Sequence, residues 1–238
     1  MIRASLRDGY ELLGDDSLAA SSSLTPAQIN EVLNSCGLES DSALVGRVAT
    51  YLKFLAKWNA RMNLTAIQAP LDVLRNLLAE SFFAAVLVGD LEGPILDIGS
   101  GAGFPGLAMA VYRPELKLIL LEPRKKRSAF LAALRRELGL TRVAVWNRRL
   151  EDCATADFAE LPTLLTMRAV GRVKEMVEQG IPLLEGSRRI LLFSSLRAAK
   201  ASIEGMKGIC WRRPSLVPWN PEHVLLLGEV QEMFPVRH

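Results

Sequence analysis

The segment 95–106 carries the residue types and spacing best suited to holding a nucleotide-like ligand. It runs Ile-Leu-Asp-Ile-Gly-Ser-Gly-Ala-Gly-Phe-Pro-Gly. A short apolar strand, a tight turn without Cβ atoms and a helix start together bring bare backbone against a ligand at a helix N-terminus. The residues of this turn expected to hold the ligand are Asp97, Gly99, Gly101 and Gly103.

The charge of the ligand distinguishes two classes that fit this turn. Residues 101–106 match G-x-G-x-x-G, which is the pattern of dinucleotide-binding proteins. However, a carboxylate at Asp97, at the end of the strand and aimed at the ligand crevice, would repel a pyrophosphate. It would attract the ammonium and sulfonium groups of S-adenosylmethionine. We therefore predict S-adenosylmethionine as the cofactor, with a dinucleotide as the alternative.

Further candidate residues lie where later strands of the chain end. Glu122 directly follows the next apolar run, about twenty residues after the glycines. In nucleotide-binding α/β sheets, an acid at the end of this second strand accepts hydrogen bonds from ribose hydroxyls. An acid interacting with the dipole of the following helix is the competing interpretation. Leu150 and Glu151 follow the third run and are the adenine candidates, although a solvated Glu-Asp pair is common there. Arg168 follows the fourth run. We expect Arg168 and Arg149 to lie nearest the methyl group that is transferred.

Basic residues are grouped along the chain. The whole chain carries +3, and its first 24 residues hold two bases and four acids, which leaves +5 for the rest. The groups are Arg124-Lys125-Lys126-Arg127, Arg135-Arg136, Arg148-Arg149, Arg188-Arg189 and Arg212-Arg213. Any one pair can be a solvated surface, but together they favour a nucleic acid substrate, since phosphate contacts need local positive charge. Residues 124–127 open a helix, where positive charge opposes the helix dipole. We predict that this cluster contacts RNA phosphates.

Composition narrows the class of protein. The 238 residues are 50% hydrophobic, enough for one catalytic domain with a small addition. The apolar stretches 82–88 and 116–121 are far shorter than the ~20 residues that span a bilayer. The scattered cysteines and histidines, which show no metal-ligand spacing, are Cys36, Cys153, Cys210, His223 and His238. We expect a cytoplasmic monomer with reduced thiols, no membrane segment and no metal.

Alternating elements are needed to position these residues. Strands are expected at 94–98, 117–122, 143–147, 163–167, 189–194, 209–214 and 223–230. Helices are expected between them at 105–112, 125–139, 171–184 and 198–206. This alternation predicts a Rossmann-like α/β fold, a mostly parallel sheet in which the last two strands, joined by a turn at 216–221, form an antiparallel edge. Helices at 25–36, 45–59 and 72–88 precede the sheet. We expect a disordered arm at 1–23, a helical cap at 24–92 and a methyltransferase domain at 93–238.

The combined motifs resemble the glucose-inhibited division protein B family. They are Trp58-Asn59, Asn63-Leu64-Thr65, the segment 97–106, Glu122, Lys126-Arg127, Arg149-Leu150-Glu151 and Arg168-Ala169. The similarity runs from about residue 43 to 230 and implies a class I methyltransferase fold. Members are bacterial 16S ribosomal RNA guanine-N7 methyltransferases, so the resemblance implies the small ribosomal subunit as substrate. It also implies cofactor contacts at Gly99, Phe104, Leu150, Glu151 and Arg168.

Two departures from the family concern the RNA-facing side. The family usually has Arg-His before a Glu-Ser pair, whereas this chain has Arg75-Asn76 before Glu80-Ser81. Its fifth strand usually delivers Lys-Gly, where this chain has Phe-Ser-Ser-Leu at 193–196. Guanine N7 has a free lone pair and needs no general base, so these absences need not abolish methylation. A paralogue acting on another RNA or a small molecule, and a non-catalytic binding protein, remain the alternatives.

Overall fold

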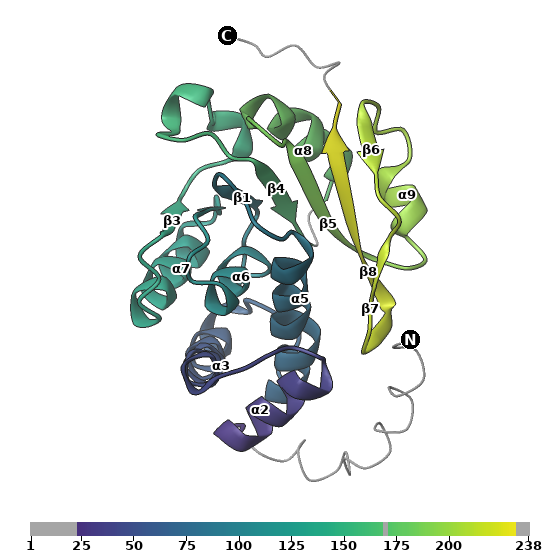
Figure 1. Cartoon of the computed structure of the whole chain (residues 1–238). Helices are drawn as coiled ribbons and strands as arrows, with labels where there is room; N and C mark the ends of the chain where they lie inside the picture. Colours follow the sequence, from purple (N-terminus) through teal and green to yellow (C-terminus); the bar gives the residue numbers. More distant parts are fainter. Residues whose placement is uncertain (1–22, 169–170, 232–238) are drawn as a thin grey trace.

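The computed structural model describes residues 23–168 and 171–231 (Figure 1). The arm expected at 1–23 lies outside the described residues, except for its last residue. The helices are α2 (Pro26–Ser35), α3 (Ser42–Met62), α4 (Pro70–Val73), α5 (Ala79–Leu87), α6 (Gly106–Tyr112), α7 (Lys125–Glu137), α8 (Val173–Gly180) and α9 (Ala199–Ile203). A π-helical turn, η1 (Leu74–Leu78), joins α4 to α5, and short 3₁₀ turns are η2 (Leu150–Asp152), η3 (Thr155–Asp157) and η4 (Ile181–Leu183).

One eight-stranded sheet forms the centre of the molecule. Its strands are β1 (Ile95–Ile98), β2 (Leu118–Leu121), β3 (Val143–Trp146), β4 (Leu164–Met167), β5 (Arg189–Ser195), β6 (Ile209–Trp211), β7 (Ser215–Val217) and β8 (Asn220–Val230). Their order is β3-β2-β1-β4-β5-β8-β6, with β7 also paired to β8. The first five strands are parallel, and β8 is antiparallel to its neighbours. This arrangement confirms the predicted Rossmann-like sheet with an antiparallel edge.

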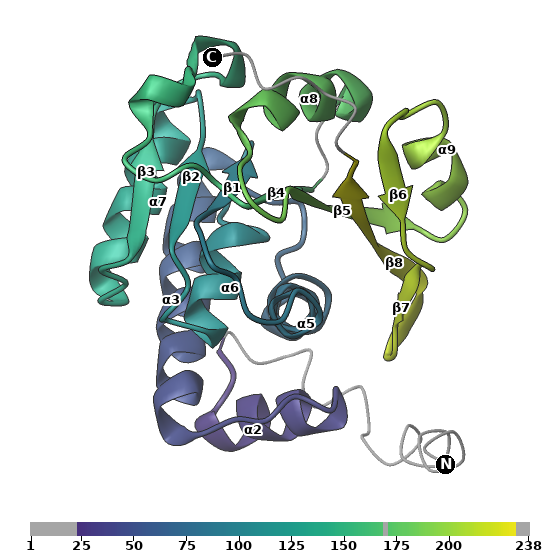
Figure 2. The same ribbon diagram turned by 45° about the horizontal axis from the view of Figure 1, so that its top comes forward.

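Side-chain alternation along the strands builds a core on each face of the sheet. In β1, Ile95 belongs to the core shared with α3, α5, α6 and α7, whereas Leu96 and Ile98 belong to the core shared with α8. Figure 2 shows α8 on one side of the sheet and α5 and α6 on the other. The strand order reverses at β1, between β2 and β4, which is where ligands bind in sheets of this type.

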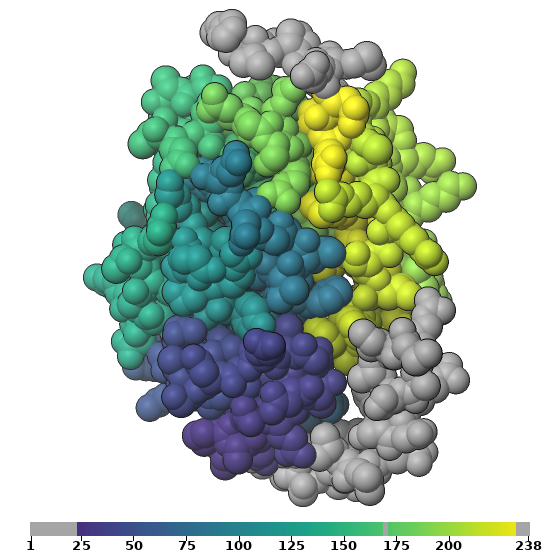
Figure 3. All heavy atoms as spheres, viewed as in Figure 1, coloured from purple at the N-terminus to yellow at the C-terminus, as the bar shows by residue number. Residues whose placement is uncertain are grey.

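The helices before β1 pack directly onto the sheet domain. The buried residues of α2, α3 and α5 form one continuous core with those of α6 and α7. In Figure 3, α2 and α3, in purple and blue, lie directly below the teal elements without a gap. The division at residue 92 therefore remains a proposal. Within the described ranges, no helix combines the length and apolar character required to cross a bilayer.

The end of α3 gives a structural reason for one of the motifs. Asn63 ends the helix in the left-handed conformation, with φ at 47°. The Asn59 side chain then donates to the Thr65 carbonyl oxygen at 3.1 Å and accepts from the Thr65 amide at 3.0 Å. The Trp-Asn…Asn-Leu-Thr pattern therefore fixes how the chain leaves α3.

Three of the expected elements differ from the structure. The helix expected at 72–88 is interrupted by η1. The strand expected at 209–214 ends at Trp211, and the turn expected at 216–221 includes part of β7 and the start of β8. The last difference arises because β8 is long enough to pair with both short strands, so the chain forms an extra hairpin there.

Candidate functional site

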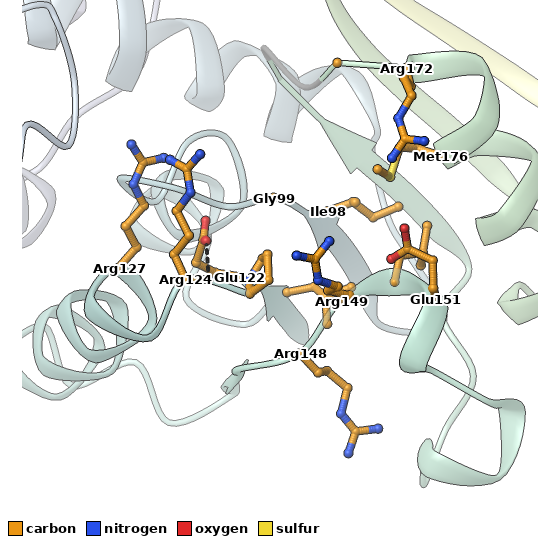
Figure 4. Close-up of a pocket in the computed structure, with 14 residues that line it drawn as sticks. Ile98, Gly99, Glu122, Arg124, Arg127, Arg148, Arg149, Glu151, Arg172 and Met176 are labelled. Carbon is orange, nitrogen blue, oxygen red and sulfur yellow. Dashed lines mark hydrogen bonds between the residues drawn. The ribbon is translucent and has the colours of Figure 1, made fainter.

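A cleft of about 370 Å³ opens where β1 and β2 end, bordered by the start of α8 (Figure 4). Its apolar lining comes from Ile98, Leu121, Leu150 and Met176. Its charged lining comes from Glu122, Glu151, Arg124, Arg127, Arg148, Arg149 and Arg172. Gly99, Pro123 and Gly171 complete it. The volume lies within the range of small-molecule sites, and an apolar surface flanked by a few charges is their usual character.

Glu122 lies directly after β2 and lines this cleft, as predicted for the residue holding a ribose. Its side chain is buried, and one carboxylate oxygen accepts from the Gly101 amide at 2.9 Å. The other accepts from the Arg124 amide at 2.8 Å. Because a carboxylate offers about four acceptor positions, lone pairs remain for ligand hydroxyls. Glu122 therefore also ties the glycine turn to the start of α7.

Asp97 corrects an expectation from the sequence. It was expected to face the ligand crevice, but it is fully buried and does not line the cleft. Alternation in β1 turns Ile98 toward the cleft and Asp97 toward α6, where its Oδ2 accepts from the Gly106 amide at 3.2 Å. Its Oδ1 has no hydrogen-bond partner in the part of the chain that the structure describes. Burial raises the pKa of Asp97 to about 7, against the opposing effect of the Gly106 amide.

The rest of the glycine turn packs against the N-terminal helices. A Cβ at Gly103, whose φ is +95°, would collide with the Tyr51 hydroxyl, which donates to the Ala102 carbonyl oxygen at 2.8 Å. Phe104 is buried with its ring centroid 5.4 Å from that of Tyr51. At Gly101 a Cβ would find ordinary room, 3.6 Å from the Gly99 carbonyl oxygen. Gly101, Gly103 and Phe104 thus lie outside the cleft lining, and their cofactor contacts stay predictions.

The candidate residues that follow β3 also line the cleft. Leu150 and Glu151 line it, together with Arg149, as Figure 4 shows. Arg148 is directed away from the other labelled side chains in that view. It pairs with Asp157 at 2.9 Å and stacks 5.2 Å above the ring of Trp146. Both arginines border the cleft, but the Arg148 side chain is turned toward Asp157, so Arg149 is the one of this pair that stays free of that ion pair.

The basic cluster 124–127 divides between two adjoining hollows. Arg124 and Arg127 line the cleft, and the whole cluster lines a neighbouring pocket of about 400 Å³. Arg61, Met62 and Asn63, at the end of α3, complete this second pocket. The backbone amides at the start of α7 have no side-chain cap. An anion reaching this pocket would therefore meet several positive groups and an open helix N-terminus.

Arg168 follows the end of β4 on the face of the sheet that α5 covers. Its Nη2 lies 2.8 Å from Glu80 Oε2 and donates to the Asn76 carbonyl oxygen at 3.0 Å. The guanidinium carbon lies 5.3 Å from the centre of the Phe193 ring. Arg168 does not line the cleft, so its predicted cofactor contact remains a prediction.

Sequence reasoning missed two groups of residues at this site. Arg172 and Met176 at the start of α8 line the cleft, and their only sequence signal is their place just after the fourth strand. Glu80 and His223 meet beside Arg168, with 3.3 Å between His223 Nδ1 and Glu80 Oε2. The segment before the Glu-Ser pair contains no histidine. In the folded chain, however, β8 places His223 next to Glu80 of that pair.

Comparison with known proteins identifies close sequence relatives. The family model described as "GidB: rRNA small subunit methyltransferase G" matches residues 45–207. A "Ribosomal RNA small subunit methyltransferase G" of Sorangium cellulosum is 35% identical over 184 residues, 76% of this chain and 77% of its own length. The protein of that name from Lactococcus lactis is 34% identical over 181 residues, 74% of each chain.

Solved structures with low sequence identity share the fold. Cofactor-bound Rv0187 from MTB superposes with a TM-score of 0.57 at 16% identity, covering 88% of this chain and 99% of its own. Magnesium protoporphyrin IX methyltransferase from Synechocystis, with bound SAM, gives 0.54 at 12% identity, covering 76% and 97%. These likenesses support the class I methyltransferase fold of the sheet.

Proposed function

The chain belongs to the GidB family of rRNA small subunit methyltransferases, and from this premise we propose that it methylates N7 of a guanine in small-subunit ribosomal RNA. The cofactor is S-adenosylmethionine. The observation that carries the proposal is the cleft at the strand-order reversal, where Glu122 meets the glycine turn among arginines. We further propose a cytoplasmic, monomeric protein with a helical cap over residues 24–92.

The residues of the cleft fit S-adenosylmethionine. Glu122 has acceptor positions free for the ribose hydroxyls, at the strand end where such acids act. Ile98, Leu121 and Leu150 offer an apolar surface for the adenine, with Glu151 beside them as an acceptor for its amino group. When bound, the cofactor supplies an electrophilic methyl group on a sulfonium.

Guanine N7 requires little of the protein beyond alignment. Its lone pair is unprotonated at neutral pH, so no side chain has to remove a proton before attack. Holding the nucleophile in line with the methyl group can by itself account for ~7–11 kcal/mol of the barrier. The side chains of this protein therefore act by binding and orienting the base and its RNA strand.

Arginines placed around the cleft supply that orientation. Arg149 lines the cleft, and Arg168 directly follows β4, the strand beside β1, so both are proposed to contact the target nucleotide. Arginine planes also stack on exposed RNA bases and pair with phosphates. The cluster 124–127, extended by Arg61, is proposed to hold phosphates that flank the target base.

Transfer of a labelled methyl group tests this function. Purified protein and labelled S-adenosylmethionine are incubated in three separate reactions. The first contains small ribosomal subunits, the second protein-free 16S RNA and the third a metabolite extract. The proposal expects label in the ribosomal RNA in one or both of the first two reactions. Label confined to the metabolites would make the protein a small-molecule methyltransferase, and cofactor binding without any transfer would make it a binding protein.

A further inference from the structure

The two terminal nitrogens of Arg168 have different surroundings. Nη2 is held by two acceptors, Glu80 Oε2 at 2.8 Å and the Asn76 carbonyl oxygen at 3.0 Å. Nη1 is buried and, across the described residues, has no hydrogen-bond partner. A buried guanidinium donor without a partner is costly, so Nη1 is the terminal nitrogen of Arg168 that is left to donate to an acceptor from outside the chain.

The wide turn η1 provides one of the acceptors. In an α-helix each carbonyl oxygen accepts from the amide four residues later, but a π turn shifts this pairing, and such turns are frequent at functional sites. Here the carbonyl oxygens of two successive residues accept from side chains. The Asn76 oxygen accepts from Arg168, and the Arg75 oxygen accepts from Trp219 Nε1 at 3.1 Å. The Asn76 oxygen of the π turn is thus directed at the residue that follows β4, and the Arg75 oxygen at the residue that precedes β8.

Glu80 provides the other acceptor and is itself fixed. Its side chain is only 2% exposed, and the same oxygen that meets Arg168 lies 3.3 Å from His223 Nδ1. The Phe193 ring lies against the guanidinium from β5. Contacts from α5, η1, β5 and β8 thus hold the Nη2 side of Arg168 in one position.

The geometry of a guanidinium gives this arrangement a consequence. A guanidinium has two edges that can donate two parallel hydrogen bonds, Nη1 with Nη2 and Nε with Nη2, and both include Nη2. A free arginine commonly uses such an edge to bind O6 and N7 of guanine together. That pairing would occupy the N7 lone pair, which is the nucleophile of the methylation.

We propose that Glu80 and the η1 turn prevent this pairing, so that Arg168 binds guanine O6 through Nη1 alone and leaves N7 free to attack the methyl group. This inference rests on the proposed function. Arg168 contacts the base, while Glu80 is a positioning residue that acts through it.

Steady-state kinetics with small ribosomal subunits test the inference. Glu80→Met removes the acceptor at similar size, Glu80→Gln retains a neutral acceptor, and Glu229→Met makes the same exchange at the exposed partner of Arg212. We expect Glu80→Met to lower kcat at least tenfold while the KM for RNA stays equal or falls, because a released arginine binds guanine unproductively. Glu80→Gln should recover part of kcat, and Glu229→Met should match the parent protein within twofold.

Combination with Arg168→Gln separates positioning from a structural role. If Glu80 acts through Arg168, Glu80→Met changes kcat less than twofold in the Arg168→Gln background. If the fold-losses of kcat in Glu80→Met and Arg168→Gln multiply in the double variant, the inference is overturned. A raised KM with unchanged kcat in Glu80→Met would overturn it as well. If Glu80→Met does not fold, deletion of Asn76, which closes the π turn to an α-helical one, should give the same kcat and KM pattern. Absence of RNA methylation by the parent protein would instead overturn the proposed function itself.

Discussion

Replacing Asp97 with asparagine should change how stability depends on pH. Asp97 is fully buried, and its pKa is raised from 3.8 to about 7 chiefly by burial. A carboxyl group whose pKa is higher in the folded than in the unfolded state stabilises the fold when protonated. That stabilisation is complete below pH 4 and is lost as the pH rises toward and through 7.

The size of the effect follows from the shift. Each pKa unit corresponds to about 1.4 kcal/mol, so between pH 5 and pH 8 the protein should lose roughly 2–3 kcal/mol through this group. Asp97→Asn cannot ionise, and its Oδ1 can still accept from the Gly106 amide. The asparagine variant should therefore gain roughly 2–3 kcal/mol relative to the parent protein over this interval.

Urea unfolding at pH 5, 6, 7 and 8 measures this difference directly. The matched control is Asp90→Asn, an exposed aspartate paired with Arg113, for which the difference from the parent should stay constant. A difference for Asp97→Asn that varies with pH no more than that of the control would refute the argument, and Asp97 would then be ionised in the folded protein throughout.

Three further changes test the turn, the cofactor contact and the RNA contacts. Glu122→Ala should raise the Kd for S-adenosylmethionine at least tenfold and also lower stability by about 1 kcal/mol, since the part-buried hydrogen bonds from the Gly101 and Arg124 amides are lost; calorimetry and urea unfolding check both. An unchanged Kd would move the ribose contact elsewhere. Gly103→Ala should lower Tm by several degrees through collision with Tyr51, and Gly103→Ala with Tyr51→Phe should recover part of the loss. Replacing Lys125 and Lys126 with glutamine should lower the slope of log Kd against log salt for RNA by about one per residue; an unchanged slope would place the phosphates elsewhere.

The strands and most helices of the sheet domain follow from the sequence because their side-chain patterns are strong. Short and largely apolar runs such as 95–98 and 118–121 are buried along their whole length and alternate with amphipathic helices, which leaves few arrangements. The π turn at 74–78 could not be predicted in this way. Its residues continue the apolar pattern of a helix, and only long-range acceptors and donors reveal the wider turn.

The location of a residue at the cleft was predictable where the residue follows the end of a strand. Glu122, Leu150 and Glu151 follow strand ends and line the cleft for that reason. The prediction that Asp97 faces the cleft was wrong because neighbouring residues of a strand point to opposite faces of the sheet. The sequence does not show which of the two faces borders the ligand. The meeting of Glu80 with His223 joins residues 143 positions apart, and no local pattern contains that information.

The most direct test of the central claim is the identity of the methylated nucleoside. Small-subunit RNA from cells lacking this protein is incubated with the protein and deuterated S-adenosylmethionine, digested to nucleosides and measured by mass spectrometry. We expect deuterated 7-methylguanosine at close to one residue per RNA, strongly reduced with Arg168→Ala. Label in any other nucleoside, or in none while the cofactor still binds, would contradict the account.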